Sequence, residues 1–414
     1  MATCYNDVQE RKAVKKNYKL LILNIIIFQF VDDYLNYSTL FRIIQISCLF
    51  LSILYSYRLY RKGSLLGYDK SVRTISCVFL FVSLEIILRG DFKSSLNENG
   101  LLIVKVASVY LLPFIILPLP NSKYCSDILH LFYKASLFVF PIWIIYNADL
   151  IQTGPKAYMS EGIGQLLPFF SAFLLGYIKY FKKKERMIIF TVYIIYLILM
   201  LLNARRNVSF SLLLYASIAY VFYLRHSLKK NVMKSAVIVL GTLLLFQALL
   251  LNFDSLAKGT FNNMASRLNE DTRSGVEEFF FHDFMNSSSL DWIFGRGMSG
   301  TYAQTVIDRD TGEINDRRTS IETGYLNMIM KGGIVYVVIV LVLLIKSVKA
   351  AFKYGNDDYK YLGTILLTYL IDLYTTNPVC DFSVRSIIFW FAVSCCLQNK
   401  NINIRKQLIR SNDI

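Results

Sequence analysis

The chain has 414 residues, of which 55% are hydrophobic and 15% aromatic, and its mean hydropathy is +0.43. Nearly uncharged runs of about 17–22 residues recur along it, long enough to cross the ~30 Å hydrocarbon core of a bilayer, which excludes an ordinary soluble domain. The formal net charge is +16, but the basic residues lie in connections between these runs rather than among stacking aromatics, which excludes nucleic acid as an expected partner. The sequence predicts an all-α, polytopic membrane protein.

Twelve transmembrane helices are predicted in chain order. They fall near residues 19–36, 38–56, 73–89, 101–118, 127–146, 163–180, 187–203, 208–224, 235–252, 323–345, 361–377 and 383–398. Basic residues cluster before the first run and after the second, sixth, eighth, tenth and twelfth, so the positive-inside rule places both termini in the cytoplasm. The chain then divides into residues 1–252 with nine helices, a large outside loop at 253–322, and residues 323–414 with three helices.

The N-terminal residues and the cysteines lead to two further predictions. Residues 1–20 are polar and basic and the first apolar run has no small-residue cleavage site, so no cleavable signal peptide is expected. The seven cysteines have no zinc-ligand spacing and lie mostly in or beside apolar runs. Neither a disulfide framework nor a metal site is therefore expected.

A short hairpin, LNARRNVSF (202–210), joins the seventh and eighth predicted helices outside the cytoplasm. Its adjacent arginines, Arg205 and Arg206, break the positive-inside rule. Two explanations are open: the side chains reach lipid headgroup phosphates, or they form a specific anion site.

The large loop at 253–322 is acidic, with seven basic and twelve acidic residues, so it is not a general polyanion-binding surface. Residues 264–286 predict one or two amphipathic helices, and DRDTGEINDR (308–317) predicts a turn at the tip of a β-hairpin. The loop's one histidine, His282, is more typical of the edge of an aromatic patch than of a catalytic base.

The segment FGRGMSGTY (294–302) places Gly295, Gly297 and Gly300 around Arg296. Glycine permits positive φ and close approach of another backbone, which suits a turn that cradles an anion. The same property suits any tight turn, which is the commoner explanation.

The segment RRTSIETGYLNMIMKGGIVY (317–336) leads into the tenth predicted helix and carries Glu322 and Lys331. The Glu322 carboxylate has the chemistry to accept a proton from a sugar hydroxyl. It also suits a cap at the helix N-terminus, and one residue can serve both purposes.

Charged residues also occur inside the apolar runs. Glu85 and Arg89 are four residues apart on one predicted helix and are expected to pair near the outer surface. Lys105 and Asp372 are costly to place in a membrane, and such residues usually face the interior of a helix bundle, so they are candidates to line a cavity.

The order of these features resembles the bacterial O-antigen polymerase (Wzy) and O-antigen ligase superfamily. The shared features are twelve predicted helices, an NARRN hairpin after the seventh, and a large loop between the ninth and tenth. Within the loop the order is also similar: EDTRSG with Arg273, then IFGRGMSGTY, then IETGYLNMIMKGGIVY. The match runs from the seventh predicted helix through the tenth.

The resemblance implies an O-antigen polymerase, a glycosyltransferase at the periplasmic face of the bacterial inner membrane that uses no cofactor, metal or nucleotide sugar. Donor and acceptor would be polyprenyl-diphosphate-linked oligosaccharides, and the partners would be membrane lipid, a chain-length regulator and a flippase. The expected catalytic residues are Arg205, Arg206, Arg273 and Glu322. The expected substrate-binding residues are Arg296, Arg318, Lys331, Gly295 and Gly297. Arginine suits a diphosphate because its planar fork binds phosphate in bidentate fashion.

Three alternatives are open: an O-antigen ligase, a flippase or other transporter, and a structural membrane partner of polysaccharide export. Ligases of the superfamily carry a histidine-asparagine pair before the corresponding helix, whereas this chain has Ile321-Glu322-Thr323, which favours the polymerase. A flippase or other transporter would also have many helices and buried charges. The large loop with ordered arginines and the absence of an internal repeat in the sequence count against it.

Overall fold

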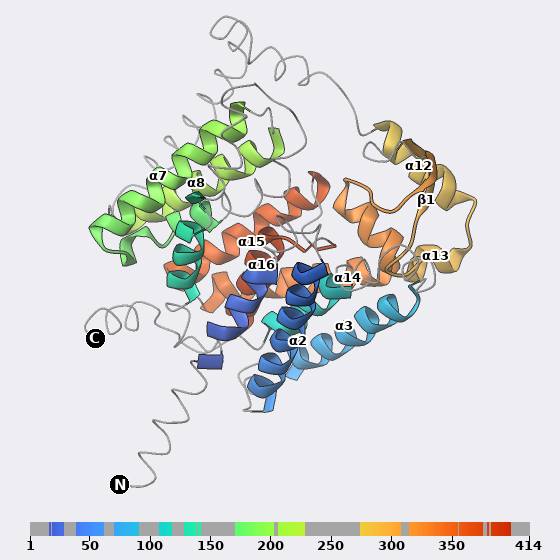
Figure 1. Cartoon of the computed structure of the whole chain (residues 1–414), viewed down its shortest axis with the longest axis horizontal. Coiled ribbons are helices and arrows are strands. Elements are labelled where there is room, and N and C mark those ends of the chain that lie inside the picture. The colour runs from blue at the N-terminus through green and yellow to red at the C-terminus, as the bar shows by residue number, and fades with distance from the viewer. Residues whose placement is uncertain are drawn as a thin grey trace, which may run out of the picture.

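A computed structural model describes fourteen ranges of the chain: 16–17, 19–28, 39–61, 70–90, 107–117, 128–138, 140–141, 170–202, 206–227, 274–307, 314–354, 356–375, 379–380 and 382–398. This part of the chain is mostly helical (Figure 1). Three helices have the length and composition to cross a membrane, at Ile43–Arg61, Lys70–Leu88 and Gly324–Lys353. They indicate a membrane protein.

The long helices coincide with predicted ones. They are α2 (Thr39–Arg61), α3 (Lys70–Leu88), α7 (Lys183–Leu202), α8 (Arg206–Ser227), α14 (Gly324–Tyr354), α15 (Asp357–Thr375) and α16 (Val384–Leu397). Shorter helical segments at Lys19–Phe28, Ala107–Ile116, Ile128–Phe138 and 170–175 fall within four other predicted helices. The predicted helix at 235–252 lies outside the described residues, and the full set of twelve stays a prediction.

Several of these helices expose an apolar stripe. On α2, the exposed large residues Ile46, Phe50, Ile53 and Tyr57 recur every three to four positions, which places them on one face. On α3, exposed apolar residues follow the same spacing. Continuous apolar surface is uncommon on soluble monomers and is the surface that a bilayer covers.

Helix α14 occupies the centre and packs against α3, α15 and α16. It runs antiparallel to α3, because the Lys346 ammonium near its end lies 3.3 Å from the Ser71 hydroxyl at the start of α3. It also runs antiparallel to α15, since the Tyr325 hydroxyl donates to the Leu370 carbonyl at 3.0 Å. One end of the bundle, here called the loop end, therefore holds the ends of α3 and α15 and the starts of α8, α14 and α16.

The loop before α14 folds as a small unit on this end (Figure 1). It contains α12 (Ser274–Met285), α13 (Ser289–Phe294) and the antiparallel strands β1 (Tyr302–Ile307) and β2 (Ile314–Arg318). A separate apolar core joins the loop residues Phe280, Phe284, Tyr302 and Ile321 to Leu326 and Met330 of α14.

The loop bears out two predictions in part. Helix α12 confirms the second half of the helical segment predicted at 264–286, whose first ten residues lie outside the described part. The antiparallel pairing of β1 and β2 confirms the hairpin, although β2 begins at Ile314, inside the stretch predicted as a turn.

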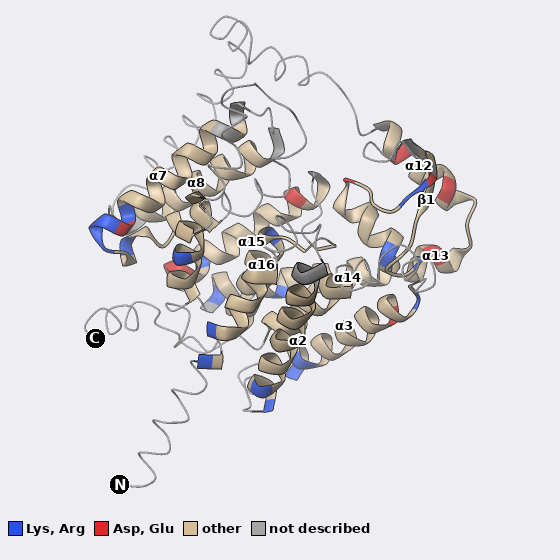
Figure 2. Cartoon of the chain, in the orientation of Figure 1, with Lys and Arg blue, Asp and Glu red and all other residues tan. Residues whose placement is uncertain are grey.

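Charge is unevenly distributed between the two ends of the bundle (Figure 2). Acidic residues gather on α12 and α13 at the loop end. The opposite end holds the basic starts of α3 and α7 and the basic last turns of α14, at Lys70, Arg73, Lys183, Lys184, Arg186, Lys346, Lys349 and Lys353. Residues far apart in sequence thus form one basic end, as expected when a single membrane face selects them.

Candidate functional site

The glycine segment 294–300 docks onto a break in α14. Gly333 has φ 68°, so the helix is interrupted there and the carbonyls just before it lose helical partners. The amide of Arg296 donates to the Met330 carbonyl at 2.7 Å, and that of Gly297 to the Lys331 carbonyl at 2.9 Å. This arrangement, here called the glycine clasp, satisfies backbone groups that the break would otherwise leave unpaired.

Two glycines make this contact sterically feasible. Gly333 has a left-handed backbone, and a Cβ there would lie 2.1 Å from the Ile293 carbonyl oxygen. Gly295, with φ 74°, would place a Cβ 2.5 Å from the Lys331 carbonyl carbon. Real Cβ atoms do not approach so closely, so each position requires glycine.

Helix α3 forms the third side of the glycine clasp. The Arg89 guanidinium donates to the Gly295 carbonyl at 2.6 Å and to the Phe294 carbonyl. It also pairs with Glu85, at 2.8 Å for one of the two contacts, which confirms the predicted pair. The amide of Met298 donates to the Ile86 carbonyl at 2.9 Å. Arg89 therefore links α3 to the loop, a role that the sequence did not predict.

Arg296 is surrounded by groups of the protein itself. Its guanidinium pairs with Asp283, pairs with Asp291 at 2.9 Å, donates to the Thr301 carbonyl at 2.7 Å and lies 4.3 Å from the centre of the Phe284 ring. Burial lowers the pKa of Arg296, but the hydrogen bonds and charges of the two aspartates outweigh it and raise the pKa overall. Arg296 therefore stays charged and holds α12, α13 and β1 together.

The neighbouring residues expected to bind substrate have similar structural contacts. The buried Lys331 ammonium donates to the Gly300 carbonyl at 2.8 Å. The amide of Gly295 donates to the Asp291 carbonyl and that of Gly297 to the Lys331 carbonyl. With these donors occupied, the segment has the geometry of a tight turn rather than of an anion cradle. Substrate binding by Arg296, Lys331, Gly295 and Gly297 stays a prediction.

Glu322 and Arg318 lie at the loop end beside the start of α14. Glu322 is exposed and precedes the helix by two residues, and the Thr323 carbonyl accepts the first helical bond from Asn327 at 3.0 Å. Glu322 and Arg318 both interact electrostatically with Tyr302, the first residue of β1. Burial raises the pKa of the Tyr302 phenol, which Arg318 opposes.

The other predicted site residues lie at the edge of the described part or outside it. Helix α8 begins at Arg206, whose side chain is not described, and Arg205, Arg273 and Lys105 fall outside the described residues. His282 is exposed on α12, and its carbonyl accepts a hydrogen bond from Asn286.

A buried polar cluster lies where α8, α15 and α16 meet at the loop end. The Ser211 hydroxyl donates to the Asp372 carboxylate at 3.0 Å, and the Tyr369 hydroxyl donates to the Arg385 carbonyl at 2.8 Å. The Arg385 charge acts on both Asp372 and Tyr215. Asp372 and Arg385 are only 2% and 4% exposed, so two ionisable side chains of opposite type are buried in the same region of the bundle.

Sequence reasoning singled out Asp372 but missed Arg385. The same signal could have found it, since Arg385 stands within the last predicted apolar run. The partners Ser211, Tyr215 and Tyr369 carry no such signal, because hydroxyl groups are common in transmembrane helices.

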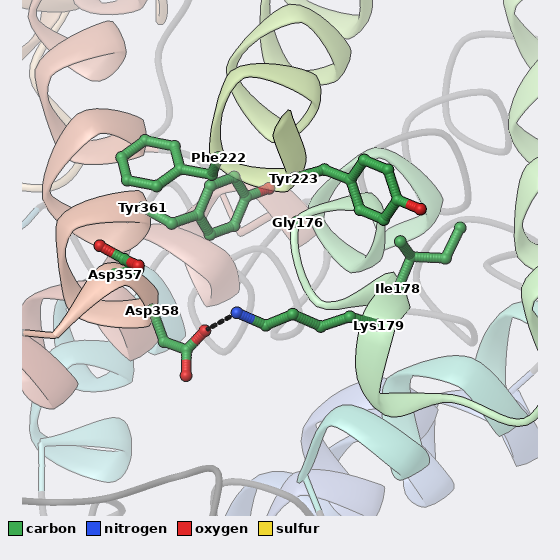
Figure 3. A pocket seen from close by; sticks show the side chains of 8 residues that line it. All are labelled: Gly176, Ile178, Lys179, Phe222, Tyr223, Asp357, Asp358 and Tyr361. Carbon is green, nitrogen blue, oxygen red and sulfur yellow. Dashed lines mark ion pairs between the residues drawn. The ribbon is translucent and has the colours of Figure 1, made fainter. Parts of the chain in front are cut away.

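A small pocket lies at the opposite, basic end of the bundle (Figure 3). Its lining comes from the start of α15, the last turns of α8 and the segment around η3 (Ile178–Tyr180). The Lys179 ammonium pairs with the Asp358 carboxylate at 3.0 Å, and the Tyr180 hydroxyl donates to the same carboxylate at 2.5 Å. These contacts tie α15 to the turn before α7, so the pocket is a structural junction.

No protein-family model matches this chain, and a search of curated proteins finds no match. The likeness to O-antigen polymerases therefore rests on the sequence motifs, their order and the predicted topology.

Proposed function

We propose that the chain is an O-antigen polymerase. In this proposal it joins polyprenyl-diphosphate-linked oligosaccharide repeat units at the periplasmic face of the bacterial inner membrane. The loop end is the periplasmic end, and the basic end faces the cytoplasm. The uneven charge of the two ends supports this orientation through the positive-inside rule.

One observation carries the proposal. The last turns of α15 contact the starts of α8 and α14, which adjoin two of the three segments that hold the expected catalytic residues. Asp372 accepts a hydrogen bond from Ser211 near the start of α8, which follows the hairpin arginines. Leu370, two residues earlier, accepts one from Tyr325 at the start of α14, which follows Glu322. Two segments separated by more than a hundred residues thus reach one region of the loop end, as a shared active site requires.

The proposed reaction uses charge rather than covalent chemistry of the protein. A hydroxyl oxygen of the acceptor sugar attacks the anomeric carbon of the donor, and the bond from that carbon to the diphosphate breaks. Arg205, Arg206 and Arg273 stabilise the departing lipid diphosphate, and the Glu322 carboxylate takes the acceptor proton. The hydrogen bond from Ser211 to Asp372 joins α8 to α15 below this region.

The test is genetic complementation. The gene is deleted in its host, and surface polysaccharide is separated by gel electrophoresis after complementation with the wild-type chain, Arg205→Ala, Arg206→Ala or Arg273→Ala. Loss of a polymerase leaves lipid A-core capped with a single repeat unit, and the arginine variants should reproduce that pattern. A deletion that leaves no attached repeat unit would instead indicate a ligase or flippase. Full-length chains from all three variants would refute the diphosphate clamp.

A further inference from the structure

Helix α13 presents an exposed apolar face. Leu290, Ile293 and Phe294 are 63%, 42% and 43% exposed and have the spacing of one helix face. Leu88 at the end of α3 and Ile334 just after the break in α14 are 74% and 46% exposed. These five residues are here called the α13 apolar patch.

The opposite face of α13 is firmly attached to the loop. Asp291 pairs with Arg296 at 2.9 Å, and the Trp292 indole donates to the Phe284 carbonyl at 2.9 Å. The Trp292 ring also packs edge-on against Phe280 and Phe284. The direction in which the patch faces is therefore fixed by the core of the loop.

The patch continues the apolar surface of two helices that could cross a membrane. Arg89 follows Leu88 in the chain and donates to the Phe294 carbonyl, which brings the end of α3 beside α13. The backbone of Gly333, next to Ile334, approaches the Ile293 carbonyl closely, which brings α14 to the same place. Both helices have further exposed apolar residues at helical spacing, Phe81 and Leu84 on α3 and Val338 on α14.

We propose that the α13 apolar patch is embedded in the bilayer, with lipid acyl chains and the glycerol region of the loop-end leaflet as its occupant. A helix with an apolar outer face and a polar, paired inner face is suited to the membrane interface. Glu85 and Arg89 border the patch as a pair, so no unpaired charge from these two residues enters it. The embedded patch sets the height of the loop above the membrane. This inference rests on membrane location alone and not on glycosyl transfer.

The test uses the full-length protein in vesicles of phosphatidylethanolamine and phosphatidylglycerol. The photoreactive residue p-benzoylphenylalanine replaces Leu290 or Phe294 in separate variants. Control variants carry it at Glu278 or His282, which are exposed on α12. After irradiation, mass spectrometry identifies what is attached. We expect lipid adducts at positions 290 and 294 and background yield at 278 and 282.

A second arm does not depend on photochemistry. Leu290→Trp and His282→Trp variants are compared in vesicles that contain brominated lipid, which quenches nearby indoles. We expect stronger quenching for Leu290→Trp. Equal quenching of the two, attachment to a second copy of the chain, or background yield at both 290 and 294 would overturn the inference. None of these outcomes depends on whether the protein makes polysaccharide.

Discussion

Two arginines at the loop end, Arg296 and Arg385, have contrasting surroundings. Arg296 lies in a glycine-rich motif that drew attention in the sequence, yet Asp283, Asp291 and an aromatic ring hold it within the protein. Arg385 lies within an apolar run, yet it is buried near the start of α16, in the polar cluster that includes Asp372. A charge that is kept where burial is costly indicates function more strongly than a charge in a tight turn.

The largest loss of stability is expected at Arg385. Two variants separate the contribution of its charge from that of its packing. We expect Arg385→Met to leave the Asp372 carboxylate buried without an opposing charge, and losing one partner of a buried charge pair costs about 3–5 kcal/mol. Adding Asp372→Asn removes the unbalanced charge and should restore most of the lost stability. The free energy of unfolding in detergent measures both variants. If the double variant is as unstable as the single one, the two charges are not coupled.

A substitution in the glycine clasp should lower the stability of the protein nearly as much. Gly333→Ala adds a Cβ that would lie 2.1 Å from the Ile293 carbonyl oxygen, at a residue with φ 68°. Overpacking and the left-handed backbone together should destabilise the protein by about 2–4 kcal/mol. The matched control is Gly275→Ala, because a Cβ there meets nothing within 4 Å. Equal melting temperatures for the two variants would contradict the clasp.

Arg296 should matter for stability but not for chemistry. Arg296→Met leaves two aspartates without their partner and should cost about 1–3 kcal/mol. At a temperature where the variant is folded, polysaccharide length should be unchanged. Short chains from a folded Arg296→Met protein would instead support the prediction that Arg296 binds substrate.

Substitution of Tyr302 should have the smallest effect on stability, and this effect should depend on pH. Tyr302→Phe removes a hydrogen bond to Gln304 and should cost about 1 kcal/mol near neutral pH. Because burial raises the pKa of the folded phenol, the unfolded chain ionises first as pH rises above about 10, and stability falls there. The Phe variant has no phenol to ionise, so the difference in stability between the wild-type protein and the Phe variant should shrink with rising pH. A difference that stays constant above pH ~10 would show that the Tyr302 phenol does not titrate differently on folding.

The sequence predicted the long helices well because each is an apolar run bounded by charges, and this pattern is local. It did not predict the break in α14, since Gly332 and Gly333 permit a break without requiring one. The break is set by docking of the glycine segment, in which Arg89 bonds to Gly295 across 206 residues of chain. Contacts between residues so far apart in the chain produce no periodic pattern in the sequence.

The candidate site was only partly predictable for the same reason. Glu85 with Arg89 was predictable because an i,i+4 pair is local. The polar cluster around Asp372 required α8, α15 and α16 to be brought together, and its hydroxyl groups carry no distinctive pattern. The sequence could not show that Asp283 and Asp291 pair with the Arg296 guanidinium, because the folded loop brings them together. Anion binding by Arg296 stays a prediction.

The most direct measurement is polymerisation by the purified protein in vesicles supplied with polyprenyl-diphosphate-linked repeat units. Glycan length and free polyprenyl diphosphate are followed together. We expect a ladder of glycans with lipid diphosphate released in step with each new linkage. The Arg206→Ala variant should lose both products, and Arg296→Met should keep them while folded. Folded wild-type protein that moves the lipid-linked unit across the membrane without forming a ladder would contradict the polymerase assignment.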